Sequence, residues 1–225
     1  MTSGYEYVYY WKDMFAEAGV SVPTTWDEFI EAGIALQNYY GASLGLGHDQ
    51  VLSMFSAKKA AMIACGDWAL QTMEKDAEDL SDLGTFYLPA RDTEEDPYNV
   101  IVQGDSFMGV TTHSKHPEAA VAFIEWFYSE EFYPEYINYI SSASSMTNFP
   151  KEKAAVLAEA DENCPDKVLI MYDGGGDDFT AIQNNITFDY KKLGAQMLTE
   201  GFDLDATFTE LNEKWKSARE KLGIR

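Results

Sequence analysis

The spacing of apolar residues along the chain predicts an α/β protein in which short strands alternate with helices. An aromatic run from Tyr5 to Tyr10, which begins after Gly4, is typical of a strand. The next residues, Lys12 to Ala18, indicate a short helix that ends at Gly19. Apolar residues at helical spacing then predict a longer helix from Trp26 to about Tyr40. The chain is therefore expected to open with a strand and two helices.

The start of the longer helix carries a second signal. Thr25 and Glu28 form a capping box, in which the Thr25 hydroxyl accepts from a helical N–H and the Glu28 carboxylate reaches back. One face of this helix is predicted to be buried, with Trp26 in the core rather than against a ligand. That face consists of Trp26, Phe29, Ile30, Gly33 and Leu36.

Two further helices are predicted later in the chain. One begins near Pro117, because proline at the first helical position sacrifices no hydrogen bond. Its apolar face consists of Ala120, Phe123, Ile124 and Phe127, with Trp126 beside it. The other is predicted to be capped by Asp205 and to pack through one apolar side. That side consists of Phe208, Leu211, Trp215, Ala218 and Leu222.

The segment Phe55–Trp68 holds the strongest candidate for a binding site. The end of a helix is followed by Ala60–Ala64, an apolar run too short for a helix and suited to a small buried strand. Gly66 permits a sharp turn, and Asp67 is suited to start the next helix through its carboxylate. This pattern places Trp68 at a strand-to-helix corner, where α/β proteins bind ligands. A tryptophan there is either a core residue or a platform for a ligand.

The charge balance excludes some partners. The chain has 225 residues, with 16 Lys plus Arg against 38 Asp plus Glu, and a net charge of −22. Such a surface repels phosphate backbones and anionic membranes, so nucleic acid is not an expected partner. The sequence contains no run of 18 apolar residues, so no membrane-spanning segment is predicted. Met1–Glu6 lacks the basic and apolar stretches of a signal peptide, which suggests that Met1 is an internal start.

The sequence points to no cofactor, metal or catalytic constellation. Cys65 and Cys164 could form a disulfide or remain free thiols. Cys65 lies in an apolar strand and resembles a small core residue. The acidic loop Asp173–Asp178 lacks the spacing of an EF-hand, so a solvated loop is favoured over a calcium site. His113 and His116 have no third zinc ligand at a matching spacing. The chain is therefore expected not to be an enzyme.

Several segments occur in the order typical of one protein family. They are Tyr9–Phe15, Pro23–Glu28, Phe55–Trp68, Leu88–Pro89, Gly104–Ser106, Ser114–Ala120 and Glu200–Phe208. Together they resemble the extracellular solute-binding proteins of bacterial ABC importers, in the sugar-binding group that includes maltose-binding protein. Two positions depart from the family pattern: Trp11 stands in place of asparagine, and Lys58 in place of glycine.

The resemblance implies a periplasmic-binding-protein-like fold of type II, mostly its second, carboxy-terminal lobe. Residues 1–89 and 141–225 would belong to that lobe, the latter with the C-terminal helix, and residues 90–140 would derive from the first lobe. The chain would be a truncated and internally shortened form of an extracytoplasmic, lipid-anchored parent protein. Implied partners are an oligosaccharide and the membrane subunits of the importer. Alternatives are a scaffold that has lost its cleft and a carbohydrate-active enzyme.

The predicted ligand site follows from the corner and from the resemblance. Trp68 is the expected stacking platform, with Gly66 and Asp67 shaping the corner. The resemblance adds residues near the crossover, on a cleft loop and at a late aromatic position. These are Tyr10, Trp11, Asp105, Ser106 and Phe179.

The Pro117 helix also suggests self-association. In the resembled family, upstream strands that this sequence does not contain would cover its apolar face. Contiguous apolar patches seldom stay exposed on monomers. Either the chain repacks so that this helix joins the main core, or two chains bury the face against each other. The second alternative, a homodimer formed through Phe123, Trp126 and Phe127, is favoured.

Overall fold

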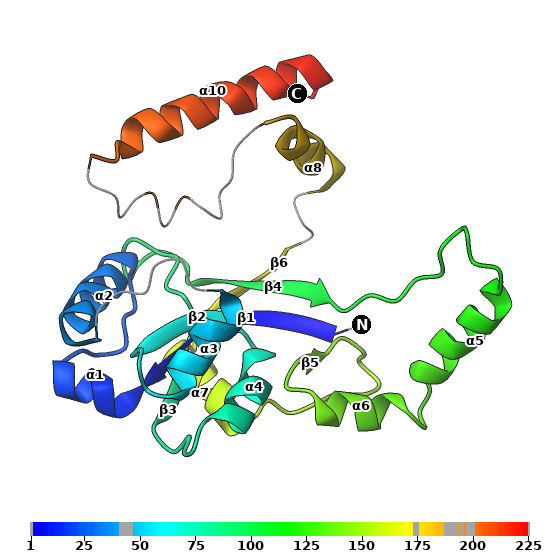
Figure 1. Cartoon of the computed structure of the whole chain (residues 1–225), viewed down its shortest axis with the longest axis horizontal. Coiled ribbons are helices and arrows are strands. Elements are labelled where there is room, and N and C mark those ends of the chain that lie inside the picture. The colour runs from blue at the N-terminus through cyan, green and yellow to red at the C-terminus, as the bar shows by residue number, and fades with distance from the viewer. Residues whose placement is uncertain are drawn as a thin grey trace. The chain divides into compact units, whose positions relative to one another are not determined.

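The computed structural model describes residues 2–40, 47–172, 176–186, 193, 196 and 201–224 (Figure 1). The chain forms two compact units, one built mainly from residues 1–171 and the other from residues 172–225. No helix in the described ranges is long and apolar enough to cross a membrane.

The first unit is organised around the long strand β1, Thr2–Trp11. The carboxy-terminal half of β1 pairs antiparallel with β2, Met62–Gly66, and with β3, Leu83–Phe86. Its amino-terminal half pairs antiparallel with β4, Asn99–Asp105, and with the short β5, Ala143–Ser144. The strand β6, Val168–Tyr172, lies beyond β4 in the sheet (Figure 1). Because both edges of β1 pair with other strands, β1 forms the centre of the sheet.

Within the described residues of the first unit, seven helices connect these strands. They are α1 (Lys12–Ala18), α2 (Trp26–Tyr40), α3 (His48–Ser56), α4 (Ala69–Asp76), α5 (Pro117–Phe127), α6 (Tyr133–Tyr139) and α7 (Ala155–Asn163). The predicted bounds of α1 and α2 and the predicted start of α5 are confirmed. Gly19 ends α1 with a positive φ of 68°, which glycine adopts without strain.

The capping box of α2 is confirmed, but its predicted buried face is only partly correct. Glu28 N–H donates to the Thr25 hydroxyl at 3.4 Å, and Thr25 N–H donates to the Glu28 carboxylate at 3.3 Å. Leu36 is buried, whereas Ile30 is exposed and Trp26 is 43% exposed. The expectation that Trp26 belongs to the core is therefore wrong. Helical spacing shows which residues share a face, but the packing partners decide how much of that face is covered.

The core of the first unit is rich in aromatic residues. Tyr7 stacks on Tyr87 with ring centroids 5.1 Å apart, and Trp11 stacks on Phe55 at 5.2 Å. Both cysteines are buried and free, so the possible disulfide is not present. Burial raises the pKa of Cys65 and of Cys164 to about 11, which keeps both thiols protonated at neutral pH.

Lys58 has a backbone conformation that explains why glycine occupies this position in the resembled family. Its φ is 52°, in the left-handed region that favours glycine. Its ammonium compensates by pairing with Asp13 at 2.7 Å and by lying 4.7 Å from the centre of the Trp11 ring. The strained backbone is thus held by contacts that glycine lacks.

A polar network joins α7 to Tyr87, the residue that follows β3, and to two lysines. The Tyr87 hydroxyl donates to one oxygen of Asp161 at 2.7 Å, and Lys153 and Lys167 bind the same carboxylate at 2.7 and 2.9 Å. Burial pushes the pKa of Asp161 upward, but these hydrogen bonds outweigh burial and hold it below its ordinary value.

We expect Asp161→Asn to destabilise the fold at neutral pH by about 1.5–3 kcal/mol, the range for hydrogen bonds to a charged group. The folded-state pKa of Asp161 is lowered, so its stabilisation is present above the unfolded pKa and is lost as pH falls through the folded one. Urea unfolding at pH 7 and pH 3 measures this, with the exposed Asp166→Asn as control. An equal loss at both pH values would contradict the prediction.

Aromatic contacts join α5 to α6. The Phe127 ring lies 4.8 Å from that of Tyr136, and Trp126 stacks on Phe132 at 4.2 Å. No residue of α5 itself is buried, and Val121, Phe123 and Trp126 are exposed.

The second unit contains α8, Gly176–Asn185, and α10, Leu204–Leu222, which pack against each other (Figure 1). The cap of α10 is Asp203, whose carboxylate accepts from Ala206 N–H at 2.9 Å. The prediction that Asp205 caps this helix is wrong, because the chain enters the helical conformation two residues earlier. Of the predicted apolar side of α10, only Ala218 is buried.

Candidate functional site

The strand-to-helix corner after β2 is present, but Asp67 does not cap the helix that follows. β2 ends at Gly66 and α4 begins at Ala69, with Trp68 at the N-cap position and no side-chain cap. Asp67 is 2% exposed and accepts from the Ser142 hydroxyl at 3.2 Å. Its carboxylate joins the corner to the segment that enters β5, so the predicted capping role is corrected.

The buried position of Asp67 affects its protonation. Loss of hydration raises its pKa above the ordinary value, although hydrogen bonds from Ser142 and from backbone N–H groups oppose this. Because the folded-state pKa is the higher one, the contribution of Asp67 to stability is fully present at acid pH and declines as pH rises. Asp67 shapes the corner and has no surface with which to contact a ligand.

Trp68 is 41% exposed, and its indole lies over Gly66. A Cβ atom added at Gly66 would be 2.4 Å from the Trp68 Nε1 and 2.8 Å from Cδ1. Glycine is therefore needed at this position for the ring to lie where it does. Trp68 Nε1–H donates to no residue in the described part of the chain, so this donor is available to solvent or a ligand.

The register of β1 places Glu6 beside this indole. Glu6 lies directly opposite Gly66, and opposite residues of an antiparallel pair point to the same face of the sheet. The Trp68 ring occupies the space above Gly66 on that face. Glu6 is exposed, so an acidic group lies on the same face as the aromatic ring.

The same face continues along β1 and β4. Gly4 pairs with Gln103, and an ideal Cβ at Gly4 would lie 3.7 Å from Gln103 Cγ and 4.0 Å from Asp105 Oδ2. Alternate residues of a strand share a face, so Gln103 and Asp105 lie on the face that carries Glu6. We name the set Trp68, Glu6, Gln103 and Asp105, with Gly4 and Gly66 between them, the Trp68 face.

The acidic groups of this region lie close enough to affect one another's protonation. Partial loss of hydration, then the negative charges of Asp67 and Asp105, raise the pKa of Glu6. This end of the sheet therefore carries a negative potential, which favours neutral or cationic ligands over anionic ones.

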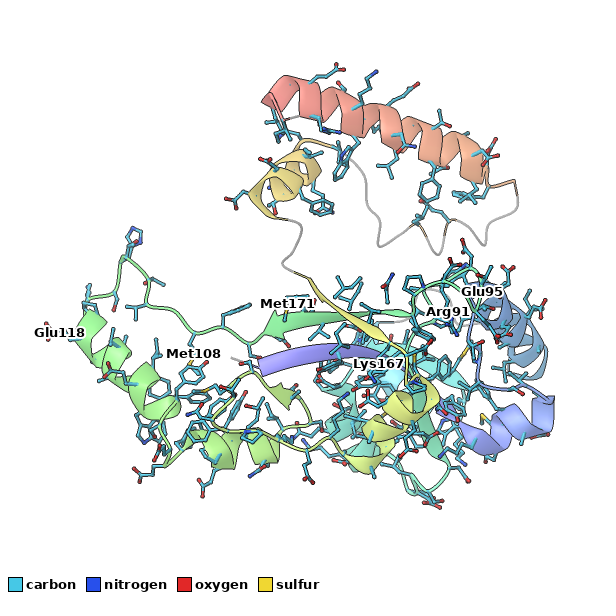
Figure 2. The ribbon with its side chains drawn as sticks, turned by 180° about the vertical axis from the view of Figure 1, so that it is seen from behind. Arg91, Glu95, Met108, Glu118, Lys167 and Met171 are labelled. Carbon is cyan, nitrogen blue, oxygen red and sulfur yellow. The ribbon has the colours of Figure 1, made fainter. Side chains whose placement is uncertain are left out.

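Asp105 and Ser106 lie where β4 ends, as predicted for a loop. Ser106 has a φ of 55°, and its N–H donates to the Asp105 carboxylate at 2.8 Å. The next two residues in the sequence line a pocket of about 360 Å³. Its lining consists of Phe107, Met108, Tyr128, Ser145 and Met146. Figure 2 labels Met108 on the stretch that leaves β4 toward α5.

Of the other predicted site residues, Tyr10 and Trp11 are covered by the core of the first unit, and Phe179 belongs to the second unit. Trp11 is 0% exposed, and its Nε1–H donates to Phe55 C=O at 2.9 Å. Tyr10 is buried, and its hydroxyl donates to Glu159 at 3.2 Å. Phe179 belongs to the second unit, where its ring lies 5.2 Å from that of Trp215. In this structure Trp11 has no surface for a ligand, which corrects its predicted role.

Within the described residues, no group of three or more His, Cys, Asp or Glu is arranged to hold a metal ion. Of the acidic loop, residues 173–175 lie outside the described ranges, and Asp177 and Asp178 form part of the first turn of α8.

Sequence reasoning missed Glu6 and Gln103. The available signal was the period-two alternation of β1. It shows that the Glu6 side chain points away from the face of Tyr7 and Tyr9, but it does not show which residues of the neighbouring strands lie beside Glu6. Strand register decides that Glu6 and Gln103 share a face with Trp68.

Comparison with known proteins identifies the family. The family model described as bacterial extracellular solute-binding protein matches residues 2–133, more than half of the chain. The chain belongs to this family of bacterial extracellular solute-binding proteins. The resemblance seen in the sequence is thereby confirmed. A search of curated proteins found no match.

Solved structures of solute-binding proteins share the α/β fold. A chitin oligosaccharide binding protein has 20% identity and a TM-score of 0.60, over 76% of this chain and 60% of its own. RafE in complex with raffinose has 18% identity and a TM-score of 0.59, over 82% and 66%. A binding protein of an ABC transporter from Bifidobacterium animalis subsp. lactis, in complex with mannobiose, has 14% identity and a TM-score of 0.70, over 98% and 70%.

These likenesses confirm the predicted type II periplasmic-binding-protein-like fold. At such low identity they show the fold alone and do not transfer a ligand. This chain spans less than two thirds of the length of the chitin oligosaccharide binding protein and of RafE.

Proposed function

We propose that this chain binds a neutral oligosaccharide on the Trp68 face and does not transform it. The observation that carries the proposal is the exposed indole of Trp68, which packs against Gly66 on the sheet face that carries the polar groups Glu6, Gln103 and Asp105. An aromatic face packs on the C–H surface of a sugar ring, while carboxylate and amide groups bind its hydroxyls. Family membership supports a binding role.

The dimensions of the Trp68 face favour an oligosaccharide over a monosaccharide. Gly66 lies opposite Glu6, and Asp105 lies opposite Thr2, four residues away along β1. At about 3.3 Å per residue, these positions are roughly 13 Å apart along the strand. One sugar ring on Trp68 would not reach Asp105, but a ligand of several rings would contact both.

Isothermal titration calorimetry with mannotriose, raffinose and a chitin oligosaccharide tests the proposal. These sugars are neutral and are of the kinds bound by proteins of the same fold. We expect binding of at least one, with no release of reducing ends on prolonged incubation. Turnover would instead favour a carbohydrate-active enzyme, and no binding at millimolar sugar would favour a scaffold.

We further propose that the parent protein works outside the cytoplasm and delivers its ligand to the membrane subunits of an ABC importer. Membership of a bacterial extracellular family supports the location, and similarity in fold to a binding protein of an ABC transporter supports the partner. We also propose a division of the chain between the two lobes of such a protein. The second lobe would consist of residues 1–89 and 141–225, and the first lobe would contribute residues 90–140.

Self-association through α5 is a separate prediction. Phe123 and Trp126 are exposed, and none of the residues of α5 is buried. We expect two copies to bury this face against each other, since such patches are rarely left open on monomers. Light scattering on the purified chain should give a dimer mass, and Phe123→Asp should give a monomer with an unchanged melting temperature. A monomeric wild-type chain would contradict the prediction.

A further inference from the structure

His48 lies against Trp68, although its position in the sequence gives no hint of this. The centre of its imidazole is 4.9 Å from that of the indole, with the ring planes at 50°. His48 is the first residue of α3, which packs against α4, the helix that follows Trp68. The two helices thus bring both rings to one corner.

The position of His48 on α3 accounts for its direction. Leu52 and Phe55 lie four and seven residues later, which puts all three side chains on one face of the helix. Leu52 and Phe55 are buried in the core. His48 continues their face beyond the edge of the core, where it is exposed and meets the Trp68 ring.

Within the described residues, both ring nitrogens of His48 retain their hydrogen-bonding capacity. Neither bonds to another residue in the described part of the chain, and the neighbouring Trp68 Nε1–H is equally unused. Any aromatic side chain at position 48 could make the ring contact with Trp68. An imidazole adds a donor and an acceptor at the border of the platform.

We propose that His48 is a ligand-contacting residue, whose imidazole hydrogen-bonds a hydroxyl of the sugar that packs on Trp68. This inference rests on the proposed function of the Trp68 face. It assigns two functions to one corner: the indole contacts the apolar surface of the ring, and the imidazole fixes its orientation through a hydroxyl. Selectivity among neutral sugars would then depend on where that hydroxyl lies.

The experiment compares His48→Phe, His48→Gln and the wild-type chain by calorimetry with the best-binding sugar among mannotriose, raffinose and a chitin oligosaccharide. His48→Phe keeps a ring against Trp68 but has no hydrogen-bonding group, and His48→Gln keeps a donor and an acceptor. We expect His48→Phe to weaken binding by about fivefold to tenfold, the effect of one lost hydrogen bond. His48→Gln should restore much of that loss.

His113→Phe is the matched control, because His113 is exposed on the loop before α5. It should bind like the wild-type chain, and all variants should share one melting temperature. If His48→Phe binds as tightly as wild type while Trp68→Ala does not bind, the proposed function stands and the role of His48 is refuted. If the wild-type chain binds none of the three sugars, the proposed function fails and the inference fails with it.

Discussion

Replacing Trp68 with alanine is expected to weaken saccharide binding by about 30-fold or more and to leave the fold intact. The indole is exposed and is supported by Gly66 beneath it and His48 beside it, rather than enclosed. A central aromatic anchor typically contributes about 2 kcal/mol or more when truncated, and this corresponds to about 30-fold in affinity. Calorimetric titration and a thermal melt of the same samples measure the two effects.

Trp26→Ala is the matched control for this substitution. Trp26 is exposed to nearly the same extent as Trp68, at 43%, but it lies on α2. Loss of an exposed tryptophan in general would affect both variants alike. If Trp68→Ala instead lowers the free energy of unfolding by about 3 kcal/mol or more, the ring is a core residue and the Trp68 face is not the binding site.

The elements that sequence reasoning predicted well are those set by local signals. The helix α1 ends at Gly19 because glycine tolerates the left-handed conformation, and α2 begins at its capping box because Thr25 and Glu28 bind each other's backbone. Each signal lies within a few residues of the boundary that it sets. These helix boundaries could therefore be predicted without knowledge of the tertiary packing.

The errors share a different cause. Trp11 was assigned to the ligand site and Trp26 to the core, yet Trp11 is buried and Trp26 is exposed. Which tryptophan is covered depends on which elements pack against it, and periodicity within one element does not contain that information. The same holds for Asp67, whose partner Ser142 is far away in the sequence.

The candidate site shows the same division. The strand, glycine and turn before Trp68 are local, and the sequence predicted the corner that they form. Glu6 and Gln103 join it only through the register of β1 with β2 and β4, and His48 only through the packing of α3 on α4. A shift of one residue in either register would turn Glu6 or Gln103 to the opposite face.

Trp11→Ala is expected to have the opposite effect to Trp68→Ala, a loss of stability of about 3–5 kcal/mol, as found for large aromatic residues in cores. Trp11 is wholly buried and stacks on Phe55. Its Nε1–H satisfies Phe55 C=O at 2.9 Å, so truncation also leaves that acceptor without its partner. Lys58 would lose its contact with the ring as well.

Urea unfolding followed by circular dichroism measures this loss, with Trp11→Phe as the matched variant. Phenylalanine keeps the stacking on Phe55 but removes the indole N–H, so about 1–2 kcal/mol should be lost, within the range for one buried hydrogen bond. A Trp11→Ala chain that unfolds at the wild-type urea concentration but no longer binds saccharide would place Trp11 at the ligand after all. Trp11 would then be the binding residue. Loss of stability identifies a tryptophan of the core, whereas loss of saccharide binding identifies one that contacts the ligand.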